Sequence, residues 1–218
     1  ASSTTTAAAT RFLSRYVTVD GRVIRHDQGG DIVSEGQSYG MLIAEIAGRP
    51  GLVGTIWRWT ARHLQRSDGL LAFHATATGQ LLDRQSATDA DVLAAYALLR
   101  YRGADADQLN RTGRDIAHAV LDVESVPVDG APVLVAGPWA KASTPPVVNP
   151  SYWMPSVYQT IARYTGDDRW AAAATEATRL LSTLTGNGAE LPPDWAQLAS
   201  GRLAASGAPD GSAPVQYG

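Results

Sequence analysis

The sequence predicts an all-α fold in which buried helices alternate with half-buried helices. Three segments are apolar on nearly every side, at 35–48, 88–101 and 151–165. Such segments are typical of helices surrounded by protein. Each is followed by a segment with apolar residues at helical spacing on one face, at 51–66, 107–123 and 168–185. Pairs of this kind indicate two concentric layers, as in an α/α toroid, and a solenoid of stacked pairs is the alternative.

Composition narrows the classes of protein. The chain has 218 residues, 44% of them apolar, and a formal net charge of -3. We expect one globular domain over residues 1–218, and the slight acidity argues against nucleic acid as a partner. No apolar run approaches the roughly 18 residues of a membrane span, so no membrane partner is expected. The absence of cysteine excludes a disulfide framework and a thiolate metal site.

Residues 1–10 are a polar, low-complexity stretch that we expect to be a linker. It has neither a basic region nor a long apolar region, so it is not a signal peptide, although it could be what remains after one is removed. A secreted, extracellular protein is the resulting expectation.

The remaining elements follow in order. A first helix is expected over 5–17, and a charged loop over 21–33. His26, Asp27 and Asp31 in that loop match no known metal-site spacing. Extended pieces are expected at 69–73 and 133–135, and prolines keep 126–150 from being helical. The Gly- and Pro-rich stretch 186–214 is expected to be loop, with one short helical piece near 194–205.

Glu35 stands at the start of the first buried helix. Ser34 suits the N-cap, and Gln37 three residues later completes a predicted capping box. Glu35 then lies beside unpaired backbone N–H groups at the positive end of the helix dipole. Read without further context, it is an ordinary first-turn acid.

The other two buried helices also start with polar side chains. Ser86 or Thr88 could cap the second, with Asp89 and Asp91 in its first turn, and capping alone would explain both acids. The third starts at Asn149-Pro150-Ser151-Tyr152. Inner helices of a toroid run parallel, so Glu35, Asp89, Asp91, Asn149 and Tyr152 are predicted to line one cleft. Asp91 lies roughly 200° around the helix from Asp89 and should point elsewhere.

Two carboxyl groups at one cleft are what glycoside hydrolysis requires, because one protonates the leaving oxygen and another assists water. A helix N-terminus favours the ionised carboxylate, whereas a general acid must keep its proton. If Glu35 is a general acid, burial or a second carboxyl group must therefore favour its protonated form. Asp89 is the expected neighbour.

Ser34-Glu35-Gly36-Gln37-Ser38-Tyr39-Gly40-Met41 resembles the acid-bearing motif of glycoside hydrolase family 8. The stretch from Ser86 to Asp91, followed by an alanine- and leucine-rich helix, is similar to the family's second signature. Further matches are Gly137-Pro138-Trp139, Asn149-Pro150-Ser151-Tyr152 and Pro193-Asp194-Trp195. The resemblance implies a six-pair (α/α)6 toroid, Glu35 as the general acid, and Asp89 binding the central sugar and holding it distorted. It also implies reaction with inversion and no cofactor.

The implied enzyme is an endo-β-1,4-glucanase acting on cellulose or a soluble β-glucan; xylan and chitosan are substrates of the same family. Its expected sugar-contacting residues are Tyr39, Trp139, Asn149, Tyr152 and Trp153. The family's general base is an aspartate in a motif resembling Tyr-Asp-Ala-x-Arg on a later inner helix, expected beyond Gly218. We therefore expect an incomplete toroid, completed by a C-terminal complementary chain.

Two other classes of function stay open. A carbohydrate-binding or inactive toroid fragment would bind saccharide without turning it over. A terpene cyclase would need an aspartate-rich metal motif, and Asp89-Ala90-Asp91 is a poor one.

Overall fold

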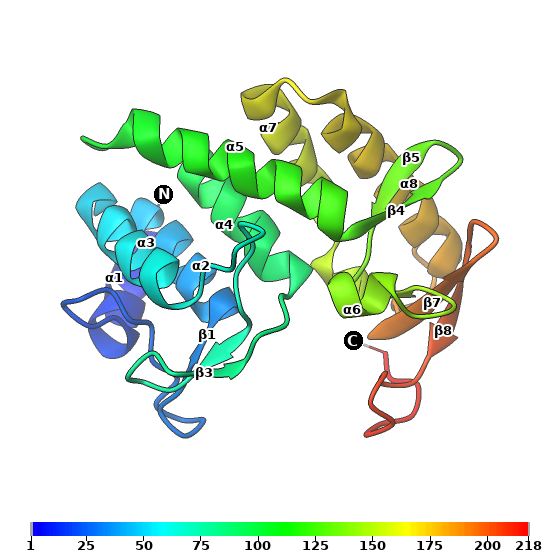
Figure 1. The fold of residues 1–218 in the computed structure, drawn as a ribbon, viewed down its shortest axis with the longest axis horizontal. Coiled ribbons are helices and arrows are strands. Elements are labelled where there is room, and N and C mark those ends of the chain that lie inside the picture. The colour runs from blue at the N-terminus through cyan, green and yellow to red at the C-terminus, as the bar shows by residue number, and fades with distance from the viewer. Residues whose placement is uncertain (1, 218) are drawn as a thin grey trace. The chain divides into compact units, whose positions relative to one another are not determined.

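The computed structural model describes residues 2–217, and the chain divides into two compact units, Ala1–Ala119 and Val120–Gly218. Helices account for about half of the residues, and short antiparallel sheets lie between them (Figure 1). In the part described, no helix combines the length and the apolar character that a membrane span needs.

The first unit is a group of helices with one small sheet. Its elements are α1 (Ser3–Tyr16), β1 (Ile32–Val33), α2 (Ser34–Ile46), α3 (Pro50–His63), β2 (His74–Ala75), β3 (Leu81–Asp83), α4 (Thr88–Arg100) and most of α5 (Ala106–Val123). The predicted linker 1–10 is wrong for residues 3–10, which form the first turns of α1. Ser2 caps that helix by accepting from Thr5 N, and alanines favour its interior.

Helix α2 is the centre of the first unit, because α1, α3 and α4 all pack against it. Gly40 allows the close approach: a Cβ there would lie 2.6 Å from the Val23 side chain and 3.3 Å from that of Ile56. Helix α4 is buried along almost its whole length, as predicted. On α5, Gly113 lies against α4, where a Cβ would come within 2.9 Å of Leu99 N.

The capping box predicted at Ser34 and Gln37 is wrong. Val33 occupies the N-cap position, and the buried Ser34 hydroxyl has no hydrogen bond within the described part of the chain. The Gln37 side chain instead accepts from Val23 N (2.6 Å) and donates to Gly21 O (3.1 Å) and Thr60 Oγ1 (2.8 Å). A fully buried amide needs all its partners, and the tertiary structure supplies them from the preceding loop and from α3.

A three-stranded antiparallel sheet, β1-β2-β3, fixes the approach to α2. Val33 pairs with His74, and Ser34 N donates to Phe73 O at 2.9 Å. The stretch 69–73, predicted to be extended, lies just before this sheet, and Ala72 N and Phe73 N donate to Leu64 O and Gln85 O. Leu71 forms an antiparallel bridge with Gln65. At the start of α4, Ala87 rather than Ser86 or Thr88 is the N-cap residue.

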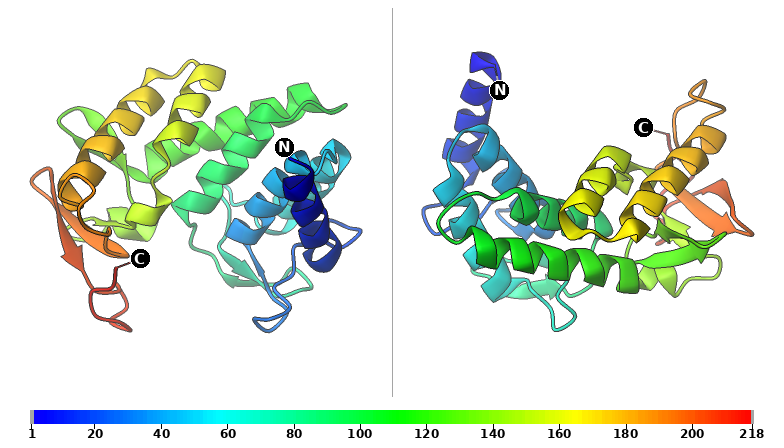
Figure 2. Two further views of the ribbon diagram at one scale, coloured as in Figure 1. Left: turned by 180° about the vertical axis from the view of Figure 1, so that it is seen from behind. Right: turned by 90° about the horizontal axis from the view of Figure 1, so that it is seen from above.

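The second unit combines two helices with a hairpin and a three-stranded sheet. Its elements are β4 (Ser125–Val128), β5 (Ala131–Leu134), α6 (Pro138–Lys141), β6 (Val147–Val148), a 3-10 turn η1 (Pro150–Tyr152), α7 (Pro155–Thr165), α8 (Asp168–Leu184), β7 (Trp195–Ala199) and β8 (Arg202–Ser206). Helices α7 and α8 pack together (Figure 2), with the rings of Tyr158 and Trp170 5.3 Å apart. The amphipathic helix predicted at 168–185 is α8.

Two predictions for this unit are wrong. The third buried helix does not start at Asn149, because Pro155 disfavours helical backbone at Met154, and α7 begins only at Pro155. Residues 194–205 are not helical but form the antiparallel hairpin β7–β8. Ser200 (φ +50°) and Gly201 (φ +72°) supply the two left-handed residues of a hairpin turn.

We predict that Gln37→Ala destabilises the protein strongly. The change orphans Val23 N and Gly21 O, and each buried unpaired group costs about 1–3 kcal/mol. The free energy of unfolding in urea should fall by at least about 2 kcal/mol. Gln108→Ala, at an exposed position of α5, is the matched control and should change it little. Equal stability of the two variants would contradict the assigned role of Gln37.

Candidate active site

Three of the predicted site residues lie together in the first unit. Glu35 is in the first turn of α2, Tyr39 follows one turn later, and Asp89 is in the first turn of α4. Glu35 is half-buried, Tyr39 is 44% exposed and Asp89 is 8% exposed. The three therefore differ in how far a ligand in solvent can reach them.

Packing of α2 against α4 brings these first turns together. Ser38 Oγ donates to Ala90 O at 2.8 Å, which fixes the start of α4 to α2 next to Glu35 and Asp89. Tyr39 lies close enough to Glu35 and Asp89 for the charges of both carboxyl groups to affect its hydroxyl. The convergence predicted for Glu35 and Asp89 therefore holds within this unit.

Burial dominates the electrostatics of the pair. Desolvation, followed by the charge of Glu35, raises the pKa of Asp89 to about 7, against the opposing effect of backbone N–H groups at Ala90 and Asp89 itself. Its Oδ1 atom is buried and has no hydrogen-bond partner in the described structure. Burial and the charges of Glu35 and Asp89 raise the pKa of the Tyr39 hydroxyl. A proton is thus held beside Glu35 up to near-neutral pH.

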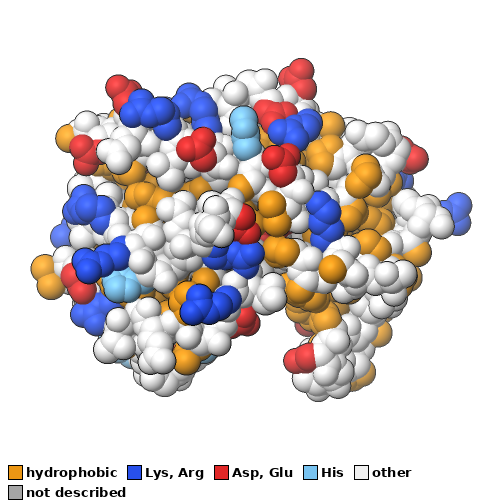
Figure 3. Space-filling model, viewed as in Figure 1, with side chains coloured by type: hydrophobic (Ala, Val, Ile, Leu, Met, Phe, Trp, Pro, Cys, Tyr) orange, Lys and Arg blue, Asp and Glu red, His pale blue; other side chains and the backbone are white. Residues whose placement is uncertain are grey.

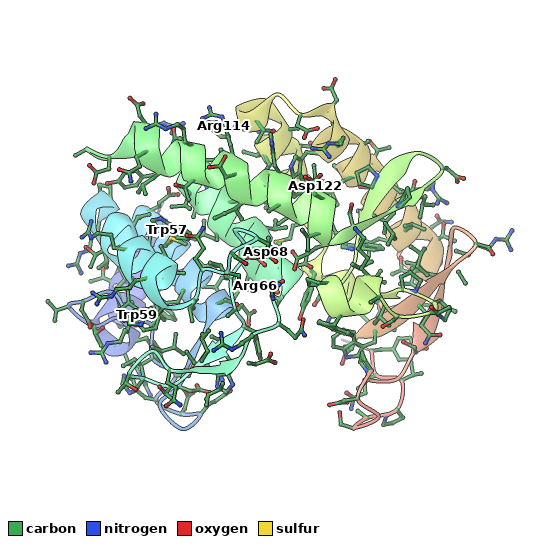
Figure 4. The ribbon with its side chains drawn as sticks, viewed as in Figure 1. Trp57, Trp59, Arg66, Asp68, Arg114 and Asp122 are labelled. Atoms are coloured by element: carbon green, nitrogen blue, oxygen red, sulfur yellow. The ribbon has the colours of Figure 1, made fainter. Side chains whose placement is uncertain are left out.

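Asp91 supports the site from another side. Its Oδ1 accepts from Leu71 N at 2.8 Å, in the turn that precedes β2. The same turn is fixed by Asp68, which pairs with Arg66 at 2.7 Å and accepts from Leu70 N (Figure 4). Asp91 points away from Asp89, as the helical geometry predicts, and its role is to hold the 68–71 turn against α4.

In the second unit, Trp139 is part of an aromatic pair. It lies on α6, is half-buried, and its ring is 6.2 Å from that of Trp195 at an interplanar angle of 59°. Trp195 is also half-buried. It was not among the predicted site residues, although the Pro193-Asp194-Trp195 segment was the signal that could have identified it.

Asn149 is the N-cap of the 3-10 turn η1, Tyr152 is its last residue, and Trp153 follows it. Asn149 Oδ1 accepts from Ser151 N (3.0 Å) and from Ser151 Oγ (2.6 Å). Tyr152 is half-buried, whereas Trp153 is 6% exposed and donates its indole N–H to Leu134 O at 2.8 Å. Trp153 is therefore packed as a core residue of the second unit, which removes its ring from the surface available to a sugar.

The charged loop before α2 forms an ion-pair cluster. Asp31 binds Arg25 at 2.5 Å and His74 Nε2 at 2.6 Å, and Arg25 together with His74 holds the pKa of Asp31 below its usual value. No group of three or more candidate metal ligands occurs within residues 2–217.

The family is established by comparison with known proteins. The model of the family described as "Glycosyl hydrolases family 8" matches residues 1–210. The chain belongs to glycoside hydrolase family 8.

Among individual relatives, a "Probable endoglucanase" of Novacetimonas hansenii is 33% identical over 195 residues, which are 84% of this chain and 55% of that protein. "Endoglucanase A" of Acetivibrio thermocellus is 31% identical over 178 residues, 76% of this chain and 36% of that protein. The chain thus spans about half or less of the length of these relatives.

A similar solved structure is the endo-β-1,4-glucanase CMCax of Acetobacter xylinum. It superposes with a TM-score of 0.82 at 27% identity, covering 93% of this chain and 66% of that one. A reducing-end xylose-releasing exo-oligoxylanase has a TM-score of 0.70 at 23% identity, covering 89% of this chain and 58% of that one, and shares the fold.

The raised pKa of Asp89 predicts a pH dependence of stability. Asp89 binds its proton more tightly when folded, so its contribution to stability is complete below about pH 4 and is lost as the pH rises through about 7. Relative to Asp89→Asn, the wild type should lose up to about 1.4 kcal/mol per pH unit between those values. Urea unfolding of both proteins at several pH values gives the free energy of unfolding as a function of pH. The same dependence on pH in the two proteins would contradict the prediction.

Proposed function

We propose that this chain carries the acid side of an inverting endo-β-1,4-glucanase. The observation that carries the proposal is the Glu35–Asp89 pair, where a buried carboxyl group keeps a proton to near neutrality beside a second, more exposed one. The endoglucanase relatives support the same reaction.

Glu35 takes the part of general acid because it is the more accessible of the two carboxyl groups. In this proposal the two carboxyl groups share one proton, and Glu35 delivers it to the glycosidic oxygen as the bond from that oxygen to the anomeric carbon breaks. Water adds to the opposite face of this carbon and loses a proton to a general base, which inverts the configuration. Tyr39, beside Glu35, is the proposed residue that orients the Glu35 carboxyl.

Asp89 takes the part of the residue that binds the central sugar. Its buried Oδ1 has no hydrogen-bond partner among the described residues, and the Asp89 carboxyl group is the proposed acceptor for a sugar hydroxyl. Two neighbouring carboxyl groups resist simultaneous ionisation, so Asp89 also favours a proton on the pair while the substrate excludes water.

The aromatic residues of the second unit are proposed sugar-stacking surfaces. The Trp139–Trp195 pair and Tyr152 keep part of their rings accessible, and such rings combine an apolar face with a polar edge. Asn149 is the proposed polar contact beside them. A β-glucan, cellulose or a soluble relative, is the proposed substrate, and we propose that hydrolysis takes place outside the cell.

The general base is proposed to come from a complementary segment outside residues 1–218. The support is the length of the relatives, since this chain covers 55% of one endoglucanase and 36% of another. Inversion needs the base to stand across a water molecule from the acid, about 6.5–9.5 Å away. A fragment without it would bind saccharide and not hydrolyse it.

We predict that Glu35→Gln in the complete enzyme lowers kcat on an unactivated β-glucan by about 10²–10⁴-fold, because proton donation to the leaving oxygen is lost. Glu190→Gln, the same change at an exposed position, is the control. Proton NMR of the initial product should show the inverted α-anomer. Near-normal turnover of Glu35→Gln, or initial release of the β-anomer, would contradict the assigned mechanism.

A second prediction concerns the base. Residues 1–218 alone should bind cello-oligosaccharides without hydrolysing them, and addition or fusion of the complementary segment should restore turnover of a soluble β-glucan. The two preparations are compared at equal concentration by reducing-sugar release. Comparable rates would show that a base lies within this chain.

A further inference from the structure

Asp31, the residue before β1, has no part in the proposed reaction, yet its carboxylate is held from two sides. It accepts from Arg25 Nε at 2.8 Å and from Arg25 Nη2 at 2.5 Å, and it lies 2.6 Å from His74 Nε2. The contact with Arg25 closes the 25–31 loop, in which Arg25 N also donates to Asp31 O. The contact with His74 joins this loop to β2. Asp31 is therefore the point at which the loop, β1 and β2 meet.

The Asp31 cluster differs from an ordinary surface ion pair. Figure 3 shows Lys and Arg side chains interspersed with Asp and Glu over α3 and the loops beside it, and exposed pairs of this kind contribute little to stability. The Asp31 side chain is only 17% exposed and meets two guanidinium nitrogens in a fork, which fixes its orientation. Arg25 and His74 lower the pKa of Asp31, so the carboxylate stays ionised. An ionised carboxylate only accepts, so Nε2 of His74 carries the hydrogen of their contact.

The contact between Asp31 and His74 depends on the register of the sheet. Val33 is opposite His74 and Ile32 is opposite Ala75, so Asp31 and His74 are diagonal neighbours on the same face. Few backbone hydrogen bonds fix this register, because β1 has two residues and the pairing of β2 with β3 is irregular. A slip of one residue would turn His74 to the face opposite Asp31. The side-chain pair therefore adds selectivity that the short strand lacks.

The register of β1 is passed directly to the candidate acid. β1 runs into α2 without an intervening turn, and Glu35 follows Asp31 by four residues. Val33, the N-cap residue, makes no side-chain capping hydrogen bond, whereas Ser34 N donates to Phe73 O at 2.9 Å. The start of α2 is thus held by strand pairing and not by a cap. A shift in that pairing moves the first turn, and with it the Glu35 carboxyl.

We propose that Asp31 is a positioning residue for Glu35: with His74 it fixes the register in which β1 enters α2, and hence the direction of the Glu35 carboxyl. The Gln37 amide holds α2 against the 21–23 loop and α3, and the Asp31 pair holds it on the side of β2. The inference rests on the proposed role of Glu35 as general acid. Such positioning matters because a misplacement of about 1 Å can lower a rate about 10²-fold.

A comparison of two substrates separates positioning from folding. Hydrolysis of an unactivated β-glucan needs the acid, whereas a dinitrophenyl β-cello-oligosaccharide has a leaving group that departs without a proton. In the complete enzyme, Asp31→Asn should lower kcat on the β-glucan at least about tenfold and kcat on the dinitrophenyl substrate less than about twofold. Equal loss on the two substrates would show a merely structural role and overturn the inference, and so would no loss on either.

Variants of the partner test the contact itself. His74→Ala should reproduce the substrate-dependent loss, and a wild-type rate on both substrates would overturn the inference. His74→Gln should restore most of the activity, because a glutamine amide can donate to Asp31 in place of the imidazole. Asp20→Asn removes the Asp20–Arg22 ion pair (3.0 Å) from the preceding loop and is the matched control, which should leave both rates unchanged. Equal Tm values would verify folding.

Glu35→Gln, measured beside these variants, separates the inference from the proposed function. If Glu35→Gln loses activity on the unactivated β-glucan alone and Asp31→Asn loses none, the acid stands and the positioning role is wrong. If Glu35→Gln loses activity equally on both substrates, or on neither, the proposed acid itself is wrong and the role of Asp31 falls with it.

Discussion

The hydrogen bonds of the buried Gln37 amide are the constraint on which the first unit depends. One side chain joins the 21–23 loop to α2 through Gly21 and Val23, and joins α2 to α3 through Thr60. Because its polar atoms lie away from water, each has to find a protein partner. The network therefore fixes the position of α2 relative to the 21–23 loop and α3. That position sets the direction of the first turn of α2, where Glu35 lies.

The candidate site also depends on α2, because α4 packs against it. Asp89 is brought to Glu35 by the packing of α4 on α2 and by the Ser38 hydrogen bond to Ala90. Burial then outweighs the helix N-terminus and keeps Asp89 protonated to near neutrality.

Sequence pattern determined much of the helical architecture. The long apolar or amphipathic segments appear as α2, α3, α4, α5 and α8, because a repeating apolar face is a local property that packing reinforces. Two specific motifs also identified the family and singled out Glu35 and Asp89. Their roles in catalysis, and the closure of the toroid, stay predictions. Short-range rules were enough to place Asp91 on a different side of α4 from Asp89.

Only the tertiary structure decided how polar side chains near the helix starts are used. Gln37 fits a capping box by spacing, yet its amide bonds to a loop and to α3, since buried donors elsewhere compete for it. Trp153 looked like a sugar-stacking ring, but its indole N–H bonds to Leu134 O in the core. The β7–β8 hairpin was missed because it depends on a left-handed turn and on pairing with β6. The raised pKa of Asp89 likewise needs a long-range neighbour and burial, which are properties of the fold and not of the local sequence.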